Sequence, residues 1–157
     1  MFAIQFSVKQ SKKKLILLAA IGAVLAAICI AATVNILEKP RDTAKSDSCG
    51  EYSLDVKNGD FSAFFGQLGI DSDNAPESEQ SVRIPEEFDE VYNEYNELQK
   101  KSGLDLSIYK GKQAEQLKFR IKNGAVNYAV LLLIDNRVIG GHLTNGEYKS
   151  EMLPLTE

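Results

Sequence analysis

The chain has 157 residues, of which 25% are charged, and its formal net charge at pH 7 is −4. The charge is unevenly distributed, because the four charged residues before Glu38 are all lysines and the remainder carries 14 basic against 22 acidic residues. A surface of that sign repels nucleic acid, whose binding depends on neutralising phosphates with lysine and arginine. Composition therefore excludes a nucleic-acid-binding protein, and the length leaves room for one folded domain.

An uncharged apolar run extends from Leu15 to Leu37, directly after the cluster Lys12-Lys13-Lys14. About 20 helical residues cross the hydrocarbon core of a bilayer, and basic residues beside such a span stay in the cytoplasm. We therefore predict a cytoplasmic basic segment at residues 1–14 and a transmembrane signal-anchor at residues 15–37. The chain would be a single-pass cell membrane protein with an extracytoplasmic C-terminal domain. A cleaved signal peptide is the alternative, although its apolar region is usually only about 7 to 15 residues long.

Residues 38–50 are polar, include Pro40 and show no apolar period, so we predict a linker there and one domain at residues 51–157. Of the two cysteines, Cys29 lies in the apolar run and Cys49 in the linker, so they cannot pair within one anchored chain. Cys49 is either an inert thiol or half of an intermolecular bridge. The domain is expected to fold without a disulfide or a metal ion.

The first part of the predicted domain contains a strand, a short helix and a loop. Apolar residues alternate with polar ones over residues 51–57, which predicts a strand. The next apolar residues follow helical spacing, with Asp60 placed as the N-cap: Phe61, Phe64, Phe65 and Leu68. Residues 71–79 are polar and predict a loop.

The strongest helical pattern covers residues 85–102, from Pro85 at the first position to Gly103 just past the end. Three strands are predicted after it, at residues 117–122, 128–134 and 138–143. The expected fold is therefore α+β, with a short helix, one long amphipathic helix and a three-stranded antiparallel meander. We expect the long helix to pack on one face of this sheet, with these contacts: Phe88, Tyr92 and Tyr95 against Leu117, Phe119, Leu131 and Leu133.

Catalytic motifs are lacking in this sequence. His142 is the only histidine, no G-x-S-x-G motif occurs, and Cys49 lies in the predicted linker. Zinc sites use three or four His, Cys or acidic ligands, which one histidine without nearby cysteines does not supply. We predict no catalytic residue, no metal and no cofactor, and hence a protein that is not an enzyme.

Two groups of residues depart from simple folding patterns: polar groups on the long helix and a glycine pair followed by histidine in the last strand. Phenols and amides bind peptides or sugars well, and they serve equally as satisfied groups where a helix meets a sheet. Departures of this kind often mark functional sites. The candidate binding residues are Tyr95, Asn96, Gln99, Gly140, Gly141 and His142.

The segment IPEEFDEVYNEYNELQKKSGLDLSIYKGK at residues 84–112 is followed by YAVLLLIDNRVIGGHL at residues 128–143. Together they resemble a family of membrane-anchored bacterial domains of unknown function in Firmicutes, over about residues 60–143. The resemblance implies an anchored extracytoplasmic domain and supplies no activity; His142 stands where that family is associated with an acidic residue. A helix before a strand meander is also similar to PepSY-type modules, which are thought to regulate proteases, at the level of fold alone.

Two classes of function follow. One is a non-catalytic interaction or sensory module at the cell envelope, with an envelope protein, a peptide or a cell-wall polymer as partner. The alternative is a small cell-envelope hydrolase. The missing nucleophile–base pattern favours the interaction module.

Overall fold

The computed structural model describes residues 41–147 and 150–156. Their strands, α-helices and 3₁₀ helices are, in chain order, β1 (Thr43–Ser46), β2 (Gly50–Ser53), η1 (Lys57–Gly59), α2 (Phe61–Gln67), β3 (Ser78–Arg83), α3 (Glu90–Lys101), η2 (Leu106–Tyr109), β4 (Gln113–Arg120), β5 (Tyr128–Ile134), β6 (Arg137–Thr144) and β7 (Met152–Pro154). The predicted basic segment at residues 1–14 and the predicted anchor at 15–37 lie outside the described residues. Within the described ranges, no helix has the length and apolar character needed to cross a bilayer.

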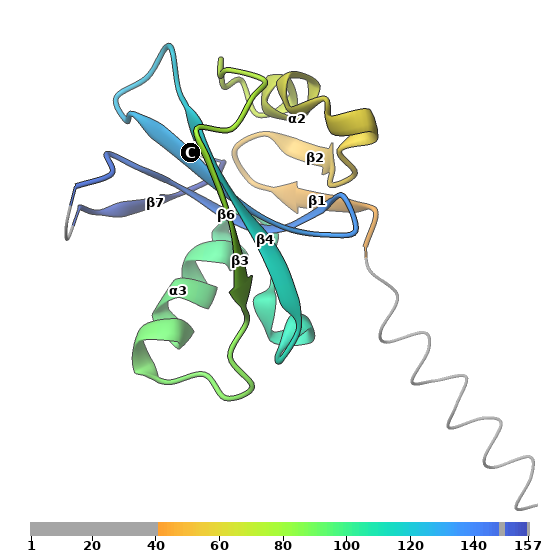
Figure 1. Ribbon diagram of the computed structural model, residues 1–157, viewed down its shortest axis with the longest axis vertical. Helices are drawn as coiled ribbons and strands as arrows, with labels where there is room; N and C mark the ends of the chain where they lie inside the picture. Colours follow the sequence, from red (N-terminus) through yellow and green to blue (C-terminus); the bar gives the residue numbers. More distant parts are fainter. Residues whose placement is uncertain (1–40, 148–149, 157) are drawn as a thin grey trace, which may run out of the picture. The chain divides into compact units, whose positions relative to one another are not determined.

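The fold is mostly β, so the predicted α+β fold with a three-stranded meander and one long helix is wrong. The described strands form a two-stranded antiparallel sheet, β1-β2, and a five-stranded antiparallel sheet in the order β3-β4-β5-β6-β7. Figure 1 shows α3 on one side of the larger sheet and α2 with the β1–β2 hairpin on the other. The three predicted strands correspond to the centre of this sheet, β4, β5 and β6.

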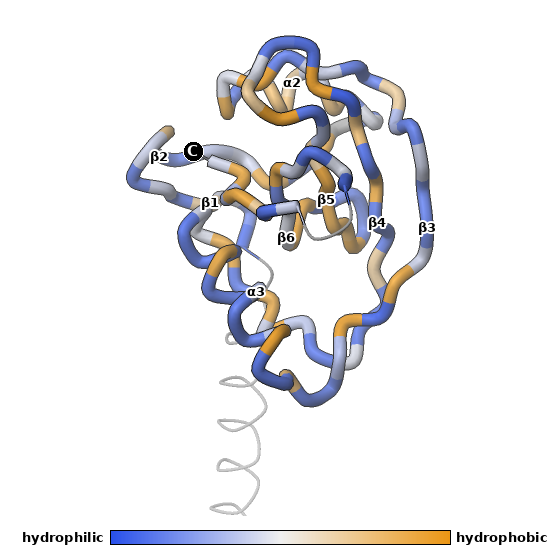
Figure 2. Tube along the Cα trace, turned by 90° about the vertical axis from the view of Figure 1, so that its left-hand side faces the viewer, coloured by the Kyte–Doolittle hydropathy of each residue, from blue (hydrophilic) through white to orange (hydrophobic). Residues whose placement is uncertain are grey.

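The strands that the sequence did not predict lie at the edges of the sheets. β3 begins inside the predicted polar loop, and nearly all its side chains are exposed; most of it is hydrophilic in Figure 2. β1 lies inside the predicted linker at residues 38–50, so the folded unit begins at Arg41 rather than at residue 51. An edge strand pairs through its backbone and needs few apolar side chains, so it leaves little periodic signal in a sequence.

The two helices differ in how well their ends were predicted. α2 begins as expected, with the Asp60 carboxylate accepting a hydrogen bond from the Ala63 N–H at 3.0 Å. α3 starts five residues later than predicted, because Asp89 rather than a residue near Pro85 caps it, accepting from the Tyr92 N–H at 2.8 Å. Its C-terminal end is as expected: Gly103 adopts a φ of 75° just past the helix.

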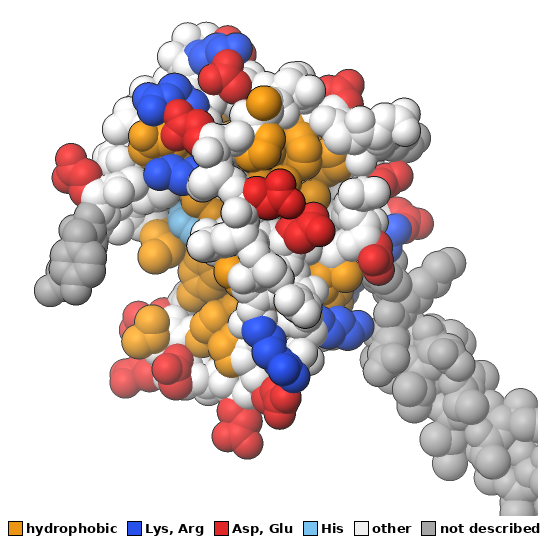
Figure 3. All heavy atoms as spheres, viewed as in Figure 1, with side chains coloured by type: hydrophobic (Ala, Val, Ile, Leu, Met, Phe, Trp, Pro, Cys, Tyr) orange, Lys and Arg blue, Asp and Glu red, His pale blue; other side chains and the backbone are white. Residues whose placement is uncertain are grey.

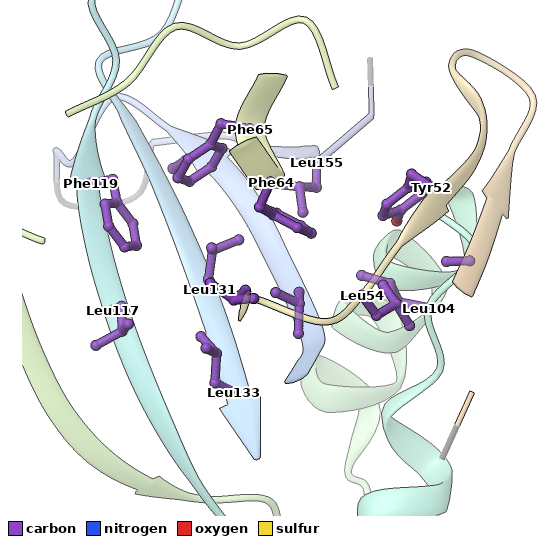
Figure 4. Close-up of a cluster of buried hydrophobic side chains, with 14 of the residues drawn as sticks. Tyr52, Leu54, Phe64, Phe65, Leu104, Leu117, Phe119, Leu131, Leu133 and Leu155 are labelled. Atoms are coloured by element: carbon purple, nitrogen blue, oxygen red, sulfur yellow. The ribbon is translucent and has the colours of Figure 1, made fainter. Parts of the chain in front are cut away.

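The central strands bury side chains on both faces, and each face has its own cover. On one face the main hydrophobic core joins alternate strand residues to α2, the β1–β2 hairpin and Leu155: Phe64, Phe65, Leu117, Phe119, Leu131 and Leu133 are among its members (Figure 4). On the other face a smaller core joins Leu132 and Ile139 to η2 and α3. The predicted packing of the long helix on Leu117, Phe119, Leu131 and Leu133 is therefore wrong, because α2 covers that face.

Candidate functional site

A cleft of about 610 Å³ lies between α3 and the sheet face that α3 only partly covers. Most of its lining is apolar or aromatic, contributed by α3 and by strands from β3 to β7: Val82, Val91, Tyr92, Tyr95, Leu98, Leu132 and Met152. Its polar lining consists of Arg83, Glu94, Gln116, His142 and Ser150. Figure 3 shows hydrophobic side chains gathered on this face near the histidine, with acidic side chains over α3. Ligand sites in proteins commonly have this size and this composition.

Tyr95 and His142 form a hydrogen-bonded pair in the cleft wall. The Tyr95 hydroxyl and His142 Nδ1 share a hydrogen bond at 2.9 Å, and the two rings meet edge to face with centroids 5.5 Å apart. Burial lowers the pKa of His142 to about 4. Burial, reinforced by nearby Tyr92, raises the pKa of the Tyr95 phenol. At neutral pH both groups are therefore uncharged, and the pair offers hydrogen-bonding atoms without a net charge.

Gln99 and the glycine pair form a buried joint between α3 and β6. The Gln99 side chain is 0% exposed, and its Oε1 accepts a hydrogen bond from the Gly141 N–H at 2.7 Å. β7 pairs with β6 only from His142 to Thr144, so this N–H lies beyond the end of that ladder. At Gly140 a Cβ atom would come within 2.9 Å of Leu106 Cδ2 and 3.2 Å of Gln99 Oε1. The Gln99 side chain thus gives the buried Gly141 N–H a hydrogen-bond partner, and the missing side chain at Gly140 lets α3 approach the strand closely.

Asn96 faces away from this joint, toward the connection between α3 and η2. Its Oδ1 accepts from the Leu106 N–H at 2.8 Å, and its Nδ2 donates to Asp105 Oδ1 at 3.0 Å. Burial opposes ionisation of Asp105, but hydrogen bonds from Ser107 and Asn96 outweigh it and lower the pKa of this carboxyl group. Asn96 therefore holds the turn that follows α3.

The structure thus separates the six candidate binding residues into three groups. Tyr95 and His142 line the cleft, Gln99 with Gly140 and Gly141 lies buried at the α3–β6 joint, and Asn96 braces η2. The other apolar residues of the cleft were not singled out from the sequence. Val91 and Leu98 share the helical spacing of Tyr95, whereas nothing pointed to Met152, which lies near the C-terminus in β7.

Among the described residues, the serine hydroxyl that lines the cleft with His142 is that of Ser150, and it shares a hydrogen bond with Thr144 Oγ1 at 2.8 Å rather than with the histidine. Cys49 lies in the β1–β2 turn and packs against the main core, whereas His142 faces α3 on the other side of the sheet. In the part of the chain that the structure describes, no three His, Cys, Asp or Glu side chains come together as a group that could hold a metal ion.

Comparison with known proteins assigns the chain to a family. No curated protein and no solved structure matches the chain. Residues 64–143 match the family model of a domain of unknown function, DUF4830. This region runs from α2 to β6, covers just over half of the sequence, and contains all six candidate binding residues. The chain belongs to the DUF4830 family.

Proposed function

We propose that this protein is a non-catalytic binding module at the cell envelope and that its binding site is the cleft between α3 and the larger sheet. The observation that carries the proposal is the apolar character of the cleft up to its rim. Among the described residues, the exposed large hydrophobic side chains are Val91 (72%), Ile108 (50%) and Met152 (49%). Two of these three, Val91 and Met152, line the same cleft from different elements.

Isolated apolar side chains on a surface need no explanation, whereas apolar side chains that meet at one opening indicate a contact surface. Covering apolar area contributes about 25 cal/mol per Å² removed from water. A ligand with apolar groups that fit the cleft would gain from covering these rim residues. The uncharged pair of Tyr95 and His142 would add hydrogen bonds that orient it.

Binding rather than catalysis is supported by the hydrogen bonds in the cleft. A tyrosine with a raised pKa stays a protonated phenol at neutral pH and cannot accept a proton, and the Ser150 hydroxyl in the same cleft bonds to Thr144 Oγ1 rather than to His142. The envelope location rests on the apolar run at residues 15–37 and the lysines before it.

A test is a fragment screen against the full chain in phosphatidylcholine nanodiscs, read by NMR of labelled Leu, Val, Ile and Met methyl groups. Apolar fragments should shift the methyl signals of Leu98 and Met152 and leave those of Ile108 unchanged. Val91→Arg should weaken this binding, and Ile108→Arg is the matched control. Fragments that shift Ile108 as strongly as Met152 would contradict the proposal. Turnover of cell-wall or peptide substrates that is lost in His142→Ala would replace the binding module with a hydrolase.

A further inference from the structure

The charge around the cleft distinguishes among the ligands that an apolar site could take. Residues 86–101, which lead into and form α3, carry six acidic and two basic side chains. Glu94 lines the cleft, and Glu90 lies one helical turn before it on the same flank of α3. Within the described residues, neither Glu90 nor Glu94 forms an ion pair.

Two basic side chains near this flank form ion pairs, and Lys118 on the sheet side lies over the Tyr128 ring, with its Nζ 3.7 Å from the ring centroid. Arg83 lines the cleft but pairs with Glu86 at 3.0 Å, and Lys100 pairs with Glu97 at 2.7 Å. His142 adds no positive charge at neutral pH, since burial lowers its pKa. The apolar cleft is therefore bordered on the α3 side by uncompensated negative charge, which attracts cations and repels anionic ligands, including the head groups of acidic lipids.

The length of the cleft and the free outer edge of β3 indicate that its ligand is a peptide. The lining reaches from Val82 on β3 to Met152 on β7, which are the two outer strands of the five-stranded sheet. At the β3 end, the backbone of Ile84 pairs inward, because its N–H bonds to Lys112 O and its carbonyl accepts from the Gly111 N–H. Backbone groups alternate in direction along an antiparallel strand, so those of Arg83 point outward, away from β4. The main chain of a bound peptide can form hydrogen bonds with this N–H and carbonyl group.

We infer that the cleft binds a basic peptide segment with bulky apolar side chains, contributed by a partner protein. The apolar side chains occupy the space between α3 and the sheet, and lysine or arginine side chains face Glu90 and Glu94. Main-chain groups of the segment reach the outward amide and carbonyl of Arg83. This inference rests on the proposed function, since it assigns an occupant to the same cleft.

The test uses three fluorescein-labelled synthetic peptides of equal length, in which leucine alternates with lysine, leucine with glutamate, or serine with lysine. Their binding to the full chain in phosphatidylcholine nanodiscs is measured by fluorescence anisotropy, with empty nanodiscs as the blank. The leucine–lysine peptide should bind at least about tenfold more tightly than either of the others, because only this peptide supplies both cations and apolar groups.

Matched variants then separate the two contributions. Glu94→Gln should weaken binding of the leucine–lysine peptide about threefold to tenfold and reduce its dependence on salt. Glu115→Gln removes the same charge from an exposed position in β4 outside the cleft lining and should leave binding unchanged. Val91→Ser should weaken binding, whereas Ile108→Ser should not.

Three results would overturn the inference. One is no binding of the leucine–lysine peptide above the blank. The second is equal binding of the leucine–lysine and leucine–glutamate peptides, and the third is wild-type affinity in Glu94→Gln. If apolar fragments still shift the cleft methyl signals, the proposed binding site stands and only its basic peptide ligand is wrong. If fragments and peptides both fail to bind, the proposed function fails as well.

Discussion

Replacing Gly140 with alanine tests whether close contact between α3 and β6 depends on this glycine. Gly140 has no positive φ, so the backbone does not require glycine and the effect arises from packing. A Cβ would lie 2.9 Å from Leu106 Cδ2, 3.2 Å from Gln99 Oε1 and 3.3 Å from Leu132 Cδ1. Overpacking of this kind costs about 1–3 kcal/mol, and the reduced entropy of the unfolded chain returns about 0.4–1 kcal/mol. We expect Gly140→Ala to lower the free energy of unfolding by about 1–2 kcal/mol.

Gly66→Ala is the matched control, because Gly66 lies within α2, has no positive φ, and a Cβ added there would meet no atom within 4 Å. That substitution should stabilise the protein by about 0.5–1 kcal/mol through helix propensity. Urea unfolding of the full chain can be followed by near-ultraviolet circular dichroism of tyrosine. All six tyrosines lie after residue 51, so the signal reports on the folded unit. Equal stabilities for Gly140→Ala and Gly66→Ala would refute the packing argument.

Three further predictions concern the core, the α3–β6 joint and the cleft. Phe65→Ala should cost about 3–5 kcal/mol, because Phe65 is 0% exposed, and a loss below about 1 kcal/mol in the same urea assay would contradict that core. Gln99→Met keeps the side-chain volume but leaves the Gly141 N–H unpaired, so we expect the free energy of unfolding to fall by up to about 1–3 kcal/mol. The loss is reduced because Gln99 Nε2 is buried without a hydrogen-bond partner among the described residues, and unchanged stability would show that the Gly141 hydrogen bond contributes nothing net. Burial lowers the pKa of His142 to about 4, so the unfolded chain binds more protons than the folded chain between about pH 4 and 6.5. The free energy of unfolding therefore rises with pH across that window and falls again as the pH is lowered through it. In urea unfolding at several pH values, the free energy of unfolding should change by at most about 3 kcal/mol across the window. The same change in His142→Gln would show that other groups cause the pH dependence.

Local patterns predicted the elements whose ends and faces are set by neighbouring residues. The four apolar residues from Phe61 to Leu68 and the cap at Asp60 specified α2 correctly. The hairpin between β5 and β6 also follows from its turn, since Asp135 and Asn136 adopt φ values of 51° and 60°. In both cases, the residues that determine the structure lie within a few positions of one another.

Pairing between distant segments could not be predicted in the same way. β3 is polar because it is an edge strand, and it is recognisable only once β4 is seen beside it. The β5 strand is apolar on both faces, so its sequence contains no information about which helix covers which face. Tyr95 and His142 were both candidates, but their contact joins residues 47 positions apart and depends on the register of β6 beneath α3. The long-range arrangement decides these features.

The attachment of α3 is asymmetric, and this asymmetry creates the cleft. The C-terminal part of the helix is fixed by buried polar contacts: Gln99 binds the β6 backbone, the Ser102 carbonyl accepts from the Tyr52 hydroxyl at 2.6 Å, and the Ser102 hydroxyl accepts from the Leu155 N–H at 2.9 Å. Toward its N-terminus, the helix presents Val91 at the surface and packs only partly on the sheet. A firmly held helix positions its side chains with little loss of conformational entropy on binding. The buried polar residues that the sequence marked as a binding site thus serve the cleft indirectly, by holding α3 over the open face of the sheet.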